Sequence, residues 1–79
     1  MSNQDLLHNA FVTVLGLPPG QVSDQLTYGS VPQWDSVAHM ALITELEDVF
    51  GVMLETEDII GLSSMVEARR ILGKHGVAF

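Results

Sequence analysis

The apolar positions of the chain recur mostly three or four residues apart, which is typical of helices, and no segment shows the alternation of a half-buried strand. The first periodic segment runs from about Asp5 to Leu15. Ser2 or Asn3 is suited to cap its start, and Gly16 followed by Pro18 ends it. Its apolar face carries Leu7, Ala10, Phe11, Val14 and Leu15.

A second helix is predicted to begin at Asp35 or Ser36 and to end at Phe50, with Gly51 as its C-terminal stop. The helical period separates an inner face from an outer face of this segment. We expect Leu42, Ile43, Leu46, Val49 and Phe50 on the inner face, and His39, Glu47 and Asp48 on the outer face.

The last third of the chain predicts a short helix and a longer one. The short helix starts after Thr56, a suitable N-cap, and Gly61 ends it after about one turn. The longer helix starts at Ser64, which matches a capping box together with Glu67.

These elements predict an all-α domain over residues 1–79, a small antiparallel bundle of three longer helices plus one short helix. The connection over residues 17–34 is long, and its spaced apolar residues indicate an ordered loop tied over the core. We expect Met40, Met53 and Met65 to fill gaps in that core. The anchors of the loop are Val22, Leu26, Tyr28 and Val31.

The charge of the chain limits its partners. Ten acidic residues against three basic ones give a formal net charge of −7. The bases, Arg69, Arg70 and Lys74, lie near the C-terminal end of the last helix, where they complement the helix dipole. Such a surface repels nucleic acid and anionic membranes and attracts a partner with a basic patch. Acidic residues also keep a small protein in solution, so charge alone leaves both roles open.

The composition also bears on location. The chain has no cysteine, so it forms no disulfide and offers no thiol of its own. No apolar run is long enough to span a bilayer, and the N-terminus shows no targeting segment. We expect a cytoplasmic monomer.

No catalytic or metal site is predicted. His39 follows Ser36 on the same side of the second helix, but the chain has no G-x-S-x-G segment, and a domain of this size offers no deep cleft for an oxyanion hole. The histidines lack the spacing of metal ligands, and we expect His8 and His75 at the surface.

The segment VPQWDSVAHM joins the long loop to the second helix and contains the only tryptophan, Trp34. Its Asp35-Ser36 pair has two interpretations. Both residue types favour helix N-termini, so the pair can be a cap and nothing more. Alternatively, the Ser36 hydroxyl is exposed where free N–H groups and the helix dipole favour a negatively charged group, such as a phosphate ester.

The run from Trp34 to Ala68 resembles the acyl carrier protein family, the phosphopantetheine-binding domains. The departures at Trp34, Val37 and Ala41 make the chain more similar to free-standing carriers of specialised pathways than to the main fatty-acid carrier. The matching residues are Asp35, Ser36, Val37, Leu42, Leu46, Glu47, Asp48, Phe50, Leu54, Glu57, Asp58, Leu62, Ser63 and Ser64.

The resemblance implies that a phosphopantetheinyl transferase, using coenzyme A and Mg²⁺, attaches 4′-phosphopantetheine to Ser36. The thiol of this arm would hold acyl groups as thioesters for enzymes of fatty-acid-like, polyketide or other specialised biosynthesis, and the carrier itself would catalyse nothing. The resemblance places partner contacts at Asp35, Val37, Met40, Glu47 and Asp48, and an acyl pocket near Leu46, Leu54, Ile59, Leu62 and Ala68. An ordinary core accounts for the pocket residues equally well.

Two alternatives stay open. One is a carrier of aminoacyl or peptidyl groups that serves an adenylating ligase and shares the same arm. The other is a non-carrier interaction module whose acidic face binds a basic protein.

Overall fold

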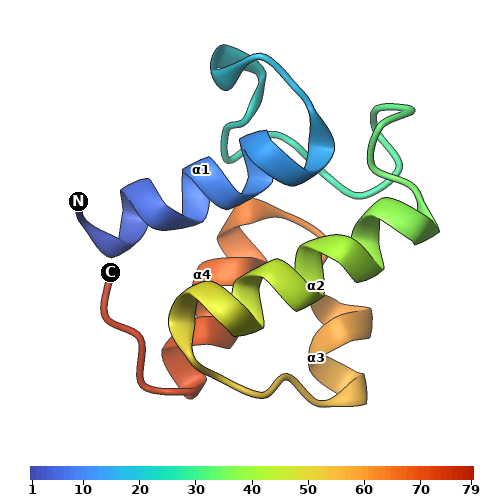
Figure 1. The fold of residues 1–79 in the computed structure, drawn as a ribbon. Helices are drawn as coiled ribbons and strands as arrows, with labels where there is room; N and C mark the ends of the chain where they lie inside the picture. The colour runs from blue at the N-terminus through green and yellow to red at the C-terminus, as the bar shows by residue number, and fades with distance from the viewer.

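Four α-helices and one 3₁₀ turn make up the chain in a computed structural model that describes all 79 residues (Figure 1). The helices are α1 (Asn3–Leu15), α2 (Ser36–Phe50), α3 (Thr56–Gly61) and α4 (Met65–Lys74), and the turn η1 (Pro19–Gln21) lies in the first loop. There is no strand, so the predicted all-α class is confirmed. None of the helices combines the length and apolar character needed to cross a membrane.

Capping residues explain where α1 starts and where α1 and α2 end. The Ser2 hydroxyl accepts a hydrogen bond from the Asp5 N–H at 3.1 Å, and the Asp5 carboxylate accepts one from the Ser2 N–H, so α1 starts two residues before the predicted Asp5. Gly16 and Gly51 adopt the left-handed conformation at φ 68° and 64°. Glycine reaches this region without a Cβ clash, and both helices stop there as predicted.

The start of α3 differs from the prediction, whereas that of α4 agrees with it. Glu55, and not Thr56, is the N-cap of α3, and the Asp58 carboxylate accepts a hydrogen bond from the Glu55 N–H at 3.2 Å. The Ser64 hydroxyl caps α4 by accepting from the Glu67 N–H at 3.1 Å.

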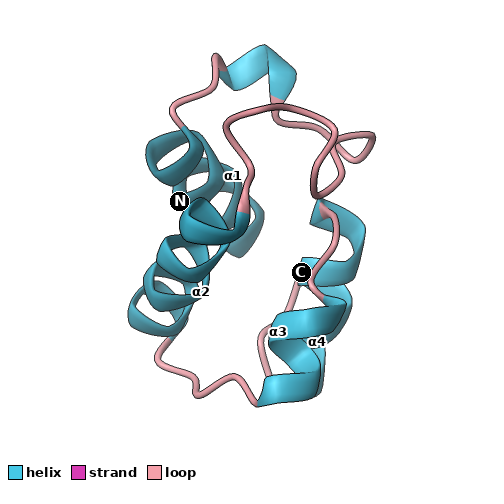
Figure 2. Cartoon of the chain, turned by 90° about the vertical axis from the view of Figure 1, so that its right-hand side faces the viewer, coloured by secondary structure: helices cyan, strands magenta, loops and turns pink.

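The core draws on α1, α2 and α4, on the first loop and on the two residues Leu54 and Leu62 that flank α3, and Ile59 of α3 packs against it. The helices α1 and α2 pack against each other, and α3 and α4 lie on the other side of the molecule (Figure 2). Trp34 is the largest of the fully buried side chains. The core consists of Leu7, Ala10, Phe11, Leu15, Leu17, Val22, Leu26, Trp34, Leu42, Ile43, Leu46, Leu54, Leu62, Met65, Ala68, Ile71 and Leu72.

Several predicted interior positions are wrong. Val49, expected on the inner face of α2, is 37% exposed. Met53 and Met40 are 83% and 51% exposed, and only Met65 of these three methionines is buried. The helical period identifies the centre of a buried stripe, but its edges depend on which neighbouring elements cover it.

The first loop is tied to the core, as predicted. Its anchors Val22 and Leu26 are buried, and Val31 is half-buried. The Tyr28 N–H donates to the Ser63 carbonyl at 2.8 Å and joins the loop to the segment before α4. The Tyr28 side chain, in contrast, is 45% exposed.

Candidate functional site

At the start of α2, Asp35 caps the helix and Ser36 keeps its hydroxyl exposed. Asp35 is the N-cap, and its Oδ1 accepts a hydrogen bond from the Ala38 N–H at 2.8 Å. Ser36 is the first residue of the helix and is exposed. Because Asp35 supplies the cap, α2 does not need the Ser36 hydroxyl for this purpose.

The electrostatics of this helix end suit a negatively charged group. With 15 residues, α2 is long enough for its aligned peptide dipoles to leave partial positive charge at the N-terminus. Its first turn contains no acidic side chain, so the carboxylate of Asp35 is the nearest negative charge in the sequence. A phosphate ester on Ser36 would lie beside unpaired N–H groups of the first turn.

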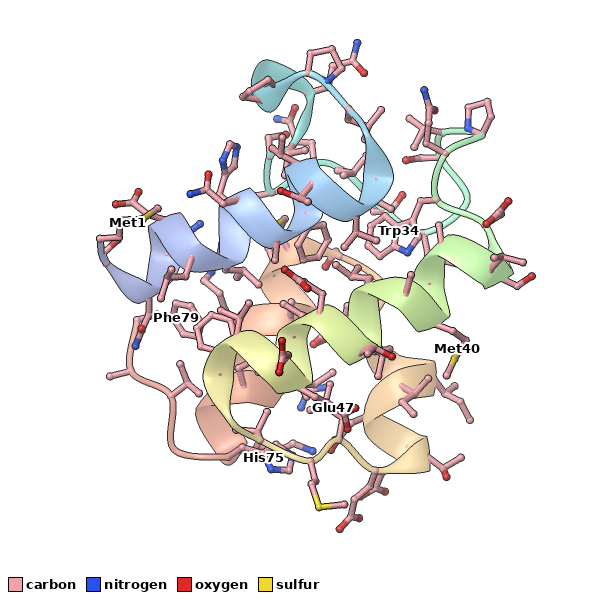
Figure 3. The ribbon with its side chains drawn as sticks, viewed as in Figure 1. Met1, Trp34, Met40, Glu47, His75 and Phe79 are labelled. Carbon is pink, nitrogen blue, oxygen red and sulfur yellow. The ribbon has the colours of Figure 1, made fainter.

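The residues around Ser36 are largely free to meet a partner. Val37 is 79% exposed, Met40 is 51% exposed and Asp35 is exposed, and toward the other end of α2 Asp48 is exposed as well. We call Asp35, Ser36, Val37 and Met40 the Ser36 surface; Met40 points outward from α2 (Figure 3). An exposed hydroxyl thus lies between apolar and acidic side chains that a second protein can contact.

Glu47 differs from the other predicted partner residues. It is half-buried, and its Oε2 accepts a hydrogen bond from the Leu54 N–H at 2.9 Å. Figure 3 shows its side chain directed from α2 toward the segment that leads into α3. Glu47 therefore has a structural role in addition to its charge.

A pocket of about 250 Å³ borders α2 one turn after Ser36, lined by Tyr28, His39, Ile59, Ile60, Leu62 and Ser63. Two of the five residues predicted for an acyl pocket, Ile59 and Leu62, line it. The other three, Leu46, Leu54 and Ala68, belong to the core.

Trp34 organises the approach to α2. Its ring meets those of Phe11 and Tyr28 edge to face, with centroids 5.4 and 5.9 Å apart. Its Nε1–H donates to Nδ1 of His39 at 3.0 Å, and Nε2 of His39 lies 2.8 Å from the carbonyl oxygen of Ile59. His39 is therefore half-buried and not on the outer face as predicted. With both ring nitrogens engaged, it is not available to Ser36 as a base.

Asp58 is a buried charge that the sequence pattern did not predict. This side chain is 3% exposed, and it accepts hydrogen bonds from Lys74 Nζ and His75 Nε2, each at 2.9 Å. The hydrogen bonds from His75, Lys74 and the Glu55 N–H hold the pKa of the Asp58 carboxyl well below its usual range. We call Asp58, Lys74 and His75 the Asp58 cluster. His75, expected simply at the surface, is part of it.

The remaining bases are also paired, and none of them pairs with α2. Arg69 lies 2.8 Å from the Asp24 carboxylate, and Arg70 pairs with Glu67. Of the three bases predicted to complement the helix dipole, only Lys74 lies in the last turn of α4. The acidic side chains of α2 therefore keep their negative field for an outside partner.

Comparison of the chain with protein-family models, with curated proteins and with solved structures finds no match.

Proposed function

We propose that this protein is a discrete acyl carrier protein that carries 4′-phosphopantetheine on Ser36. The observation that carries the proposal is the exposed Ser36 at the open N-terminus of α2, with the cap supplied by Asp35. The resemblance of the run from Trp34 to Ala68 to the carrier family supports the same residue.

The residues around Ser36 fit the phosphate of such an arm. The hydroxyl is exposed, and the helix end favours negative charge. When bound, the arm would supply the thiol that this cysteine-free chain lacks. The chain's own part is to present the serine to a transferase and to be recognised by acyl-loading and acyl-processing enzymes.

Recognition would combine apolar contact with electrostatic attraction. Val37 and Met40 offer exposed apolar area, and Asp35 and Asp48 offer charge to partners with basic patches. Charge complementarity speeds encounter more than it tightens the complex, which suits a carrier that must bind and leave many times.

The arrangement of the helices, the oligomeric state and the cellular location are part of the same proposal. We infer an antiparallel bundle of α1, α2 and α4 with the short α3, because the three longer helices share one core and Ile59 of α3 packs against it. We further infer a monomer that works in the cytoplasm, where its acidic surface keeps it from nucleic acids and anionic membranes.

Co-expression with a broad-specificity phosphopantetheinyl transferase, followed by intact-mass measurement, tests the proposal. We expect the wild-type chain to gain the mass of one arm and Ser36→Ala to gain none while keeping its helical circular dichroism. Ser63→Ala, which removes another exposed serine, is the matched control and should be modified like the wild type.

An unmodified wild-type chain, under conditions that load a control carrier, would overturn the proposal. The acidic α2 would then favour a non-carrier interaction module, whose partner binding survives Ser36→Ala. If the arm is attached, loading assays with acyl and with aminoacyl donors distinguish an acyl carrier from an aminoacyl or peptidyl carrier.

A further inference from the structure

A hydrogen-bonded bridge links three separate segments of the chain. Trp34 ends the first loop, His39 lies in the second turn of α2, and Ile59 lies in α3. The bridge runs from the indole Nε1–H of Trp34 to Nδ1 of His39 at 3.0 Å, and from Nε2 of His39 to the Ile59 carbonyl oxygen at 2.8 Å.

The hydrogen-bond partners of His39 are compatible with only one of its protonation states. An indole N–H only donates, so Nδ1 of His39 must accept and carry no proton. A carbonyl oxygen only accepts, so Nε2 must carry the proton and donate. His39 therefore fits the bridge as the neutral imidazole with its proton on Nε2.

Protonation of His39 is incompatible with one half of the bridge. It places a second N–H on Nδ1, directed at the N–H of the Trp34 indole, and two donors repel each other. Trp34 has 0% exposure, so its N–H cannot find water without movement of the loop. The bond from Nε2 to Ile59 survives, because an imidazolium also donates there.

The surroundings supply no group that would reverse this effect. Tyr28 is the titratable side chain that meets His39 edge to face, with ring centroids 5.2 Å apart, and a phenol does not ionise in the range where histidine titrates. In α3, Asp58 is held by the bases of its cluster, and Glu57 is exposed, as is the Glu55 that precedes the helix. On the side of α2, the Asp35 carboxylate is engaged in the cap.

We propose that the bridge of Trp34, His39 and Ile59 is a proton-operated latch that holds the first loop against α2 while His39 is neutral and releases it when His39 is protonated. Release frees the Trp34 indole, against which the Tyr28 ring packs edge to face, whereas the Tyr28 N–H keeps its bond to the Ser63 carbonyl. The Tyr28 side chain, which lines the 250 Å³ pocket, then gains room to move, so the pocket opens on the loop side. The latch needs no modification of Ser36 and stands or falls separately from the carrier proposal.

The experiment follows both ends of the bridge in one pH titration from about 7.5 to about 5, the range over which histidine changes charge. Nitrogen-15 NMR reports the protonation of each His39 ring nitrogen. Trp34 is the only tryptophan, so indole fluorescence and exchange of its N–H report its own bond. The variants are His39→Gln, which cannot be protonated, and His8→Gln as the control that leaves the bridge in place.

We expect Nδ1 of His39 to be unprotonated and Nε2 protonated at the upper end of the range. On acidification, the fluorescence change should share its midpoint with His39, and indole N–H exchange should accelerate by at least about tenfold, as expected when a buried donor loses its acceptor. The change should disappear in His39→Gln and persist in His8→Gln.

A Trp34 signal that does not change while His39 titrates overturns the proposal. So does a pH response that persists in His39→Gln or disappears in His8→Gln. If His39→Gln does not fold, the residue-resolved titration of the wild type decides alone, because coincident or separate midpoints support or reject the latch directly.

Discussion

Two histidines hold the short helix α3 in place, and protonation affects their hydrogen bonds in opposite ways. At the bridge, neutral His39 donates to the backbone of Ile59 and accepts from Trp34. At the Asp58 cluster, His75 and Lys74 donate to a buried carboxylate, and His75 does so more strongly as a cation. A helix of six residues does not form alone, so these attachments position it.

Acid acts differently on the two histidine sites. Protonation of a histidine breaks the bond from Trp34 at the bridge, whereas it reinforces the cluster. The cluster weakens only when Asp58 itself takes up a proton, which needs a much lower pH. Mild acid should therefore free Trp34 of the first loop from His39, while α3 keeps its bond to His39 through Ile59 and its connection to α4 through Asp58.

The largest effect is expected at Trp34, which carries the bridge. Trp34→Ala removes a fully buried aromatic side chain and should lower the free energy of unfolding by about 3–5 kcal/mol, most of the stability of a small domain. Urea unfolding followed by circular dichroism measures this loss. Met53→Ala, at an 83% exposed position, should change stability by less than about 0.5 kcal/mol. A loss at Trp34 as small as this control would contradict the burial of Trp34 in the core.

The next effect is expected at Asp58 and appears in the pH dependence of stability. The folded-state pKa lies below the usual value of 3.8, so the carboxylate stabilises the fold above about pH 4, and this contribution is lost as the pH falls below that. Asp58→Asn should be less stable than the wild type at pH 7 and should show a flatter decline in acid. Urea unfolding at several pH values measures both, and Asp48→Asn, at an exposed position, should follow the wild-type curve.

A smaller effect on stability is expected at Glu47, which binds the segment between α2 and α3. Glu47→Ala leaves the Leu54 N–H without its acceptor and should lower the free energy of unfolding by about 1–2 kcal/mol. Asp48→Ala, its exposed neighbour, should cost less than about 0.5 kcal/mol. Equal losses in the two variants would refute a structural role for Glu47.

The smallest effect on stability is expected at Val37, away from both attachments. Val37→Asp changes a 79% exposed side chain, so the free energy of unfolding should stay within about 0.5 kcal/mol. If partners use the Ser36 surface, modification of Ser36 by a transferase should slow by roughly tenfold. Val66→Asp, at an exposed valine in the first turn of α4, is the control. Equal modification rates would remove Val37 from the recognition surface.

The sequence predicted those helix boundaries that depend on residues nearby in the chain. The ends of α1 and α2 follow from capping side chains and from glycines with positive φ, and these signals lie within a few residues of each boundary. The prediction of Thr56 as the cap of α3 was wrong: Glu55 is the cap, and its N–H donates to Asp58, which serves the cap and the cluster together.

The attachments of α3 could not be predicted, because their partners are distant in sequence. Asp58 bonds to Lys74 and His75, which lie 16 and 17 residues away, and His39 reaches Ile59 across 20 residues. No local pattern marks such pairs. The same limit applies to the candidate site: the Asp35-Ser36 pair was visible in the sequence, but its division into a cap and an exposed serine required the hydrogen bond to Ala38.

The separation of cap and hydroxyl at the start of α2 also makes position 36 a practical attachment point for probes. Since Asp35 secures the helix, Ser36→Cys should fold like the wild type and would carry the only thiol of the protein. A fluorophore or spin label coupled there would report directly on how partner proteins approach this end of α2. Labelling at this point would need neither a transferase nor the removal of competing cysteines.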